Sequence, residues 1–466
     1  MNKFMSKAKA LRLAIVTIAV GLSASSCTSK DDLQSVNTRA ITSVITVSGA
    51  ITSNTTWTSD NEYDLNGKVY VSNGATLTIQ PGTLIKGLPA LNDLKVNTSA
   101  LIITRGSKID AQGTAANPIV MTASSGVKGG WGGIVLLGNA QINQTPNQQI
   151  EGIDSTRIVI PAGVKVTYGT NDATKNTESS GTLKYVRVEY AGAAISDANE
   201  LNAFTFGGVG SGTTLEHLQA YKGADDAFEF FGGCVNAKYL ISTATDDDAF
   251  DFDFGYTGKL QFLVATIDAS MSYSSDPNGI ECDNDKQADG TGSNNTPYTH
   301  PYISNLTFVG TVDGKVTPTA TSPTVFLKSC ADFRRNCQYT LVNSILYGAK
   351  TGILDETSNT DVTDPIKLEN NVVVASPAGT GVNFSGVDVV SGTNSGLASY
   401  STITLSSPWG NAYTSTALTP TGGYAYDYNT YNAASISSFF VNTDWKGGAL
   451  DASGVYWINN SWVKTN

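Results

Sequence analysis

Basic side chains are scarce in this 466-residue sequence, and histidine is nearly absent. Lys and Arg total 29 against 40 Asp and Glu, so the formal net charge is -11, and there are two His. Nucleic acids and anionic membrane surfaces are bound through clusters of Lys and Arg, and the sequence contains no such cluster. We therefore expect no nucleic-acid partner. The cysteines form neither a CxxC pair nor a cluster with histidine, which argues against zinc.

Long apolar runs are also missing, apart from one of twelve residues at 11–22 that basic residues flank. Twelve residues are too few to span a bilayer, so this run predicts an export signal. The following "SASSC" resembles a lipobox, in which Cys27 is diacylated and becomes the new N-terminus. The next stretch, "TSKDD" (28–32), resembles the short signal that sends Bacteroidetes lipoproteins to the outer face of the outer membrane. The alternative is an ordinary signal peptide that is cleaved nearby.

We therefore expect a lipoprotein signal peptide over residues 1–26, a lipidated tether over 27–44, and a location on the cell surface, anchored by lipid to the outer membrane. Such a lipoprotein could serve an outer-membrane transporter, although no residue identifies that partner. Four cysteines remain besides Cys27. In an exported protein, Cys330 and Cys337, which close "CADFRRNC", predict a disulfide. The state of Cys234 and Cys282 is left open, with buried thiols as one alternative.

No segment after residue 45 shows a sustained helical period; short β-rich runs alternate with Gly, Asn, Asp and Ser turns instead. Residues 67–87 contain three such runs, divided by Asn73-Gly74 and Pro81-Gly82, and residues 99–124 give a second version. Sequence repeats of about 20 to 30 residues with three strands each are typical of the coils of a β-solenoid.

Two strand types then alternate along the middle of the chain. The first type is "TLKYVRVEYAG", "TLEHLQAYKGA", "AKYLISTATDD" and "LQFLVATIDAS", starting at Thr182, Thr214, Ala237 and Leu260. The second is "NAFTFGG", "DAFEFFGG", "DAFDFDFG" and "NGIECDND", starting at Asn202, Asp226, Asp248 and Asn278. No crossover helix fits between them. We therefore predict an all-β fold, a single-stranded right-handed parallel β-helix over residues 45–466, with a β-propeller as the alternative.

These coils, together with "GWGGIVLLGNA" (130–140) and "FFVNTDWKGGAL" (439–450), resemble a family of secreted right-handed parallel β-helix proteins of Bacteroidetes-type bacteria, many of them lipoproteins or surface-attached. More distantly, the chain resembles the pectate-lyase-like superfamily. The resemblance covers most of residues 45–466. It implies the fold and no particular reaction, because a fold does not fix its chemistry.

Carboxylates concentrate in the second strand type. Alternation along a strand places Glu229, Asp251 and Glu281 on one outward row, with Asp253 and Asp283 on a parallel row. We expect Lys328 of "TVFLKS" to follow Glu281. Like charges on rungs about 4.8 Å apart repel, and a hard cation removes that cost. The hypothesis is therefore a Ca²⁺ site, whose ligands are Asp251, Asp253, Glu281 and Asp283, flanked by Glu229 and Asp285.

A solvated acidic face is the alternative for this grid of carboxylates. For Asp225, Asp226 and residues 246–248, the alternative is the ordinary role of Asp in turns, bonding to nearby backbone. His217 stands at the repeat position of Tyr185, so we expect it to be structural, whereas His300 has no assigned role.

The acidic face favours a non-catalytic surface protein that binds a glycan or another envelope component. The alternative function is a Ca²⁺-dependent polysaccharide lyase, or another polysaccharide-active enzyme, with Lys286 or Lys328 taking a proton. The Gly-His-Gly signature of β-helical polygalacturonases is absent from the sequence. Neither function is decided by the residues alone.

Overall fold

The structure is a computed structural model. It describes residues 41–90, 97–153, 158–196, 199–268, 271, 273, 277–285, 292–310, 315–316, 325–356, 367–374, 395–396 and 430–465. All of them belong to one compact unit, Ser35–Asn466. Among them, no helix is both long enough and apolar enough to cross a membrane.

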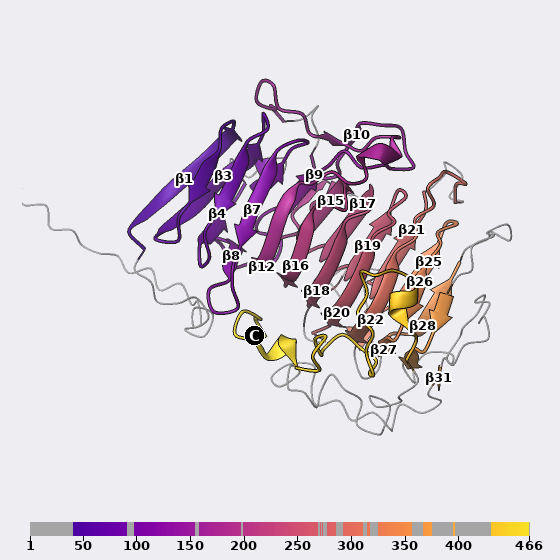
Figure 1. The fold of residues 1–466 in the computed structure, drawn as a ribbon. Helices are drawn as coiled ribbons and strands as arrows, with labels where there is room; N and C mark the ends of the chain where they lie inside the picture. Colours follow the sequence, from indigo (N-terminus) through magenta and orange to yellow (C-terminus); the bar gives the residue numbers. More distant parts are fainter. Residues whose placement is uncertain are drawn as a thin grey trace, which may run out of the picture. The chain divides into compact units, whose positions relative to one another are not determined.

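Twenty-five of the described strands join into one sheet that winds as successive coils, and almost every coil contributes a rung to each of three parallel ladders (Figure 1). Long strands bend and supply rungs to two ladders. Ladder A comprises β2 (Thr55–Trp57), β4 (Thr76–Ile79), β7 (Lys108–Gln112), the first parts of β12 (Gly181–Glu189), β16 (Thr214–Tyr221), β18 (Asn236–Thr243), β20 (Lys259–Thr266) and β22 (Tyr302–Val309), then β26 (Thr340–Val342) and β29 (Lys367–Glu369).

The other two ladders complete each coil. Ladder B begins with the first parts of β1 (Ser43–Ile51) and β3 (Asn61–Val71), followed by β5 (Leu84–Gly87) and β8 (Ile119–Ala123). It continues with the second parts of β12, β16, β18, β20 and β22, and then β27 (Ile345–Tyr347), β30 (Val372–Val374) and β31 (Ser395–Gly396). Ladder C comprises the second parts of β1 and β3, β6 (Ala100–Ile103), β9 (Ile134–Leu137), β15 (Phe204–Val209), β17 (Phe228–Gly233), β19 (Phe250–Asp253), β21 (Ile280–Asp283), β25 (Ser329–Arg334) and β28 (Thr351–Asp355).

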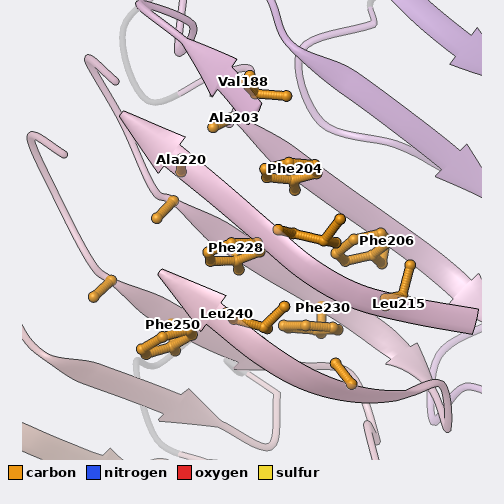
Figure 2. Close-up of a cluster of buried hydrophobic side chains, with 14 of the residues drawn as sticks. Val188, Ala203, Phe204, Phe206, Leu215, Ala220, Phe228, Phe230, Leu240 and Phe250 are labelled. Carbon is orange, nitrogen blue, oxygen red and sulfur yellow. The ribbon is translucent and has the colours of Figure 1, made fainter. Parts of the chain in front are cut away.

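The repeat predicted from the sequence is confirmed in its register. Leu183 pairs with Leu215, which pairs with Ala237 and then Leu260. On ladder C, the rings of Phe204, Phe228 and Phe250 stack inside the coils at centroid distances of 4.9 and 5.6 Å (Figure 2). A fully buried Phe contributes about 2 to 3 kcal/mol to stability, so the aromatic repeat is a core feature.

From β12 to β30, each coil bends from ladder A to ladder B at a residue with positive φ. Tyr185, His217 and Tyr239 hold this position at 50°, 57° and 62°, and their rings stack on the outside at 4.3 and 4.4 Å. His217 is thus a packing residue, as its place in the repeat predicted.

An insertion between β9 and β12 lies over the outer face of ladder C. It contains β10 (Gln148–Gln149), β11 (Thr167–Tyr168) and the 3-10 turn η4 (Ala173–Lys175). Its side chains Ile150, Val166 and Tyr168 form a buried cluster with Val135 and Phe231 of ladder C. Two hairpins also project from the coils: β13 (Ala194–Ser196) with β14 (Asn199–Glu200), and β23 (Lys315–Val316) with β24 (Val325–Phe326). The outer face of ladder C is therefore largely covered.

The described C-terminal residues, 430–465, form no rung, which differs from the prediction that coils continue to residue 466. They contain the 3-10 turns η6 (Ala433–Ser435) and η7 (Trp457–Asn459) and pack Trp457 and Trp462 against ladder B. Arg187 of β12 donates to the Trp462 carbonyl oxygen at 2.6 Å. Gly448 lies so close to the Leu263 backbone that a Cβ would be 2.0 Å from its carbonyl oxygen. The glycines of "KGGAL" therefore allow the C-terminal segment to pack closely on the β-helix, and this stretch does not form another coil.

Candidate functional site

A column of polar side chains runs along the outer face of ladder C. Thr205, Glu229, Asp251, Glu281 and Asp332 are register partners in β15, β17, β19, β21 and β25. We call this set the carboxylate column. Glu229, Asp251 and Glu281 confirm the predicted row. The fifth position of the column was predicted to be Lys328 and is Asp332, because Val325–Phe326 of "TVFLKS" pairs antiparallel with β23 and leaves the rung to β25. The Lys328 ammonium lies 2.7 Å from an Asp332 carboxylate oxygen.

The column is buried, although the sequence predicted a face open to solvent. Glu229 and Asp251 are only 5% and 7% exposed, because the insertion lies over them. The segments that lie over the column bring two further carboxylates close to it, Glu151 of the insertion and Glu200 of β14. Burial, and then the charge of Glu200, raises the pKa of Glu151 to about 7. Neither residue could be assigned to the site from the sequence, because their contribution depends on how distant segments pack.

One half of the predicted grid is neutralised by arginine. The Arg334 guanidinium donates to Glu281 and, through Nε, to Asp283 at 3.0 Å. Arg335 donates to the second oxygen of Asp283. β25 pairs Arg334 with Asp283 in register. Glu281 and Asp283 are therefore satisfied by ion pairs and do not join Asp251 and Asp253 in the predicted four-carboxylate site.

Asp285, predicted as a flanking ligand, follows β21 and is not part of the column. Asp285 accepts a hydrogen bond from the Asn295 side-chain amide at 3.0 Å. Lys286, the candidate base of a lyase, lies outside the described residues.

The other half of the column forms a compact triad of acids. Each of Asp226, Glu229 and Asp251 offers an oxygen, and these oxygens lie within 4.8 Å of one another. We call these three residues the acid triad. Burial first, and neighbouring carboxylates next, raise the pKa of Asp226 and Glu229 well above the ordinary range. For Asp251, burial raises the pKa to about 6, against the lowering effect of Arg334. Three acids at this separation need either protons or a cation to remain buried.

Asp253 stays outside this triad. Its Oδ1 is buried without a hydrogen-bond partner among the described residues, and burial, followed by the charges of Asp251 and Asp283, raises its pKa well above the ordinary range.

The acidic residues that precede these strands cap the next coil. The Asn202 side-chain oxygen accepts from the Asp226 N–H at 3.2 Å, Asp226 Oδ1 accepts from the Asp248 N–H at 2.8 Å, and Asp248 Oδ1 accepts from the Asn278 N–H at 2.6 Å. Asn278 continues the series by accepting from the Ser329 N–H at 3.2 Å. The turn role expected of these Asp residues is therefore present, but the backbone they bond belongs to the neighbouring coil. We call this series the cap ladder.

A cleft of about 770 Å³ opens beside the acid triad. Its wall is built largely from Gly and Ala together with Thr98 and Ser125, and three carboxylates line it: Glu200, Asp225 and Asp247. Asp225 and Asp247 form a second group of close carboxylates with Asp226, so Asp226 links the cleft to the triad. The doubled acids of "DDAFEFFGG" and "DDAFDFDFG" thus each send one residue to the cleft and one to the cap ladder.

The cysteines correct one prediction. No disulfide joins Cys330 and Cys337. β25 runs extended from Cys330 to Arg334, about 13 Å at 3.3 Å per residue, before the chain turns at 335–336, and the Cys337 thiol instead lies beside Cys282. Cys282 and Cys330 are fully buried thiols, which agrees with the buried-thiol alternative for Cys282.

His300 also has a structural place. Its two ring nitrogens lie 3.1 Å from Gln338 Oε1 and 3.0 Å from Thr340 Oγ1, and its ring stacks on Tyr302.

The three parallel ladders and their stacked core define a parallel β-helix protein whose acidic outer face adjoins a cleft. Residues 49–422 match the family model described as pectate-lyase like beta helix domain, and the chain belongs to that family. The fold expected from the resemblance is thereby confirmed. No curated protein matches the chain, and no solved structure matches it.

Proposed function

We propose that this β-helix is a non-catalytic binding protein of the cell surface, attached to the outer membrane by lipid on Cys27, that recognises a glycan or another envelope component. The observation that carries the proposal is the cleft of about 770 Å³ with Glu200, Asp225 and Asp247 in its wall. Clefts of about 300 to 1,000 Å³ with a few convergent polar groups are typical of small-ligand sites.

The chemistry of the wall favours a neutral glycan. Carboxyl groups, ionised or protonated, accept hydrogen bonds from hydroxyl groups, which sugars present in numbers. Glycine and alanine leave the backbone accessible to a ring that lies against the wall. A uronic-acid polymer would instead bring its own negative charge beside three carboxylates, in a chain of net charge -11. We therefore expect neutral oligosaccharides to bind more tightly than uronates.

The observations that favour binding do not extend to catalysis. A lyase needs a base beside the substrate carbon, and Lys328 forms its ion pair with Asp332, a residue of the buried column. Arg334 and Arg335 are likewise engaged by Glu281 and Asp283.

A panel of soluble neutral and acidic glycans tests the proposal, read by titration calorimetry. We expect binding of a neutral glycan that Asp225→Asn and Glu200→Gln weaken by about tenfold or more, the loss of a hydrogen bond to a charged group. Asp110→Asn is the matched control, because Asp110 lies on ladder A away from the cleft. Binding that the cleft variants leave unchanged contradicts the assignment of the cleft. Ultraviolet-absorbing unsaturated products from a uronic-acid polymer contradict a non-catalytic function.

A further inference from the structure

The acid triad concentrates negative charge where the described residues supply little compensation. Two unit charges about 4.8 Å apart repel by about 3.5 kcal/mol at an effective dielectric of 20. The nearest guanidinium groups, Arg334 and Arg335, are already bound to Glu281 and Asp283. Asp226, Glu229 and Asp251 form no ion pair among the described residues. The triad therefore needs either protons or a further positive charge at this place.

The hydrogen bonds around the triad orient its oxygens without using all of them. Asp226 uses Oδ1 to accept from the Asp248 N–H, and Glu229 uses Oε2 to accept from the Asn202 side-chain amide. Asp251 contacts Glu229, and its Oδ1 stays available for another contact. Protein groups that fix one oxygen of a carboxylate while the other stays available are typical of metal ligands.

Unpartnered oxygens at the triad point to a ligand independently of the charge count. Asp251 is 7% exposed, and its Oδ1 has no hydrogen-bond partner among the described residues. Thr205 is 1% exposed, and its Oγ1 also lacks one. Thr205 pairs in register with Glu229, which pairs with Asp251. Buried polar atoms are rarely left unsatisfied in native proteins, and two of them adjoin the same three acids.

We propose that Asp226, Glu229 and Asp251 bind one divalent cation, Ca²⁺ in preference to Mg²⁺, with the Thr205 hydroxyl as a further oxygen ligand. Ca²⁺ is held by carboxylate and neutral oxygens at about 2.3 to 2.6 Å, so oxygens on opposite sides of the ion lie about 4.6 to 5.2 Å apart. Mg²⁺ demands a tighter octahedron and retains several waters, for which a site buried under the insertion leaves less room. The ion would replace the missing positive charge beneath the cleft wall.

This site differs from the one expected from the sequence, which shares Asp251 and the flanking Glu229 with the triad but not Asp226. It also goes beyond the proposed function, because the cleft can fail to bind a glycan while the triad still binds Ca²⁺.

Titration calorimetry with CaCl₂ on the purified full-length chain, freed of metal by a chelator and held at neutral pH, tests the site. We expect one ion per chain, with binding weakened on the order of 100-fold by Asp251→Asn or Glu229→Gln, because each removes one of three charged ligands. Asp253→Asn is the matched control, being two residues along the same strand and outside the triad. It should change the affinity by less than about threefold, a small step on the scale of tenfold per 1.4 kcal/mol.

Two results overturn the proposal. One is the absence of binding to the wild-type chain at millimolar Ca²⁺, which would mean that protons alone neutralise the triad. The other is binding that Asp253→Asn abolishes and Asp251→Asn leaves intact. If a triad variant does not fold, Tb³⁺ luminescence on the wild-type chain gives a second readout. Burial, and then the charges of Asp253 and Glu229, raise the pKa of Tyr168, which places its ring near the triad. We therefore expect tyrosine-sensitised emission that Ca²⁺ displaces; emission that Ca²⁺ leaves unchanged contradicts the site.

Discussion

At the scale of single residues, the role of each carboxylate depends on which side chain the next coil places beside it. Glu281 and Asp283 meet Arg334 on β25, whereas Glu229 and Asp251 meet other acids. The residue types along each strand are similar in the two halves of the column. Charge balance at a given rung is therefore a property of the stacking and cannot be assigned from one strand alone.

Arg334→Gln tests the ion-paired half. Glu281 and Asp283 are 12% and 5% exposed in their side chains, so removing the guanidinium leaves two buried carboxylates with one cation fewer. Breaking a buried pair in this way costs about 3 kcal/mol or more, and we expect that loss in the free energy of unfolding measured by urea denaturation. The double variant Arg334→Gln with Glu281→Gln should recover part of it. A loss below about 0.5 kcal/mol, typical of a surface position, contradicts the buried pair.

His217 makes stability depend on pH on the acid side. Burial between Tyr185 and Tyr239 lowers its pKa from 6.5 to about 4, against the opposing effect of Glu216. The unfolded chain binds a proton at higher pH than the folded chain, so stability falls as the pH drops from about 6.5 through about 4. The full effect is about 3 kcal/mol.

His217→Phe should keep the ring stack, since Phe262 occupies the equivalent position at φ 63°. We expect the difference in unfolding free energy between the variant and the wild type to grow in favour of the variant as the pH falls over that window. Parallel stability curves for the two proteins contradict this account of His217.

At the scale of elements, the cap ladder ties successive coils together at one corner. The acceptors of the series are Asn202, Asp226, Asp248 and Asn278. An amide oxygen therefore serves this position as well as a carboxylate oxygen. Burial and neighbouring acids raise the pKa of Asp248 well above the ordinary range. We therefore expect Asp248→Asn to match or exceed the wild type in thermal stability at neutral pH.

Asp248→Ala should instead lose about 1 to 2 kcal/mol, because the Asn278 N–H is left unsatisfied. Thermal unfolding of the two variants separates the roles. If Asn and Ala destabilise equally, the carboxylate charge matters rather than the cap.

Most of the elements could be predicted from the sequence because each coil repeats its own pattern. The alternation of "DAFEFFGG" and "DAFDFDFG" determined which side chains share a face, and the register of β17, β19 and β21 follows it. The prediction that "TVFLKS" forms the rung after β21 was wrong, because a short apolar run can form a hairpin strand as well as a rung of a coil. The burial of the column was also missed, because it depends on the insertion at 138–180, whose contacts with ladder C join residues far apart in the chain.

At the scale of the whole molecule, the proposed location rests on the N-terminal residues, which lie outside the described residues. Cys27→Ala removes the only thiol in the lipobox-like sequence. Stable anchoring depends on the acyl chains, each buried CH₂ contributing about 0.8 kcal/mol, so we expect the variant to move from the membrane to the soluble fraction on cell fractionation. Ser26→Ala is the matched control and should stay with the membrane. Membrane retention of the Cys27 variant contradicts the lipid anchor.

We propose that the coils stack their acids on the outer face of ladder C into a cation site beneath the cleft. A crystal structure of the full-length chain with Tb³⁺ or Mn²⁺, examined by anomalous diffraction, tests that claim most directly, because the ion is located independently of any variant. The account predicts a single strong anomalous peak among Asp226, Glu229 and Asp251, absent after Asp251→Asn. A peak between Asp253 and Asp283, or an acid triad without any peak at saturating ion, would contradict it.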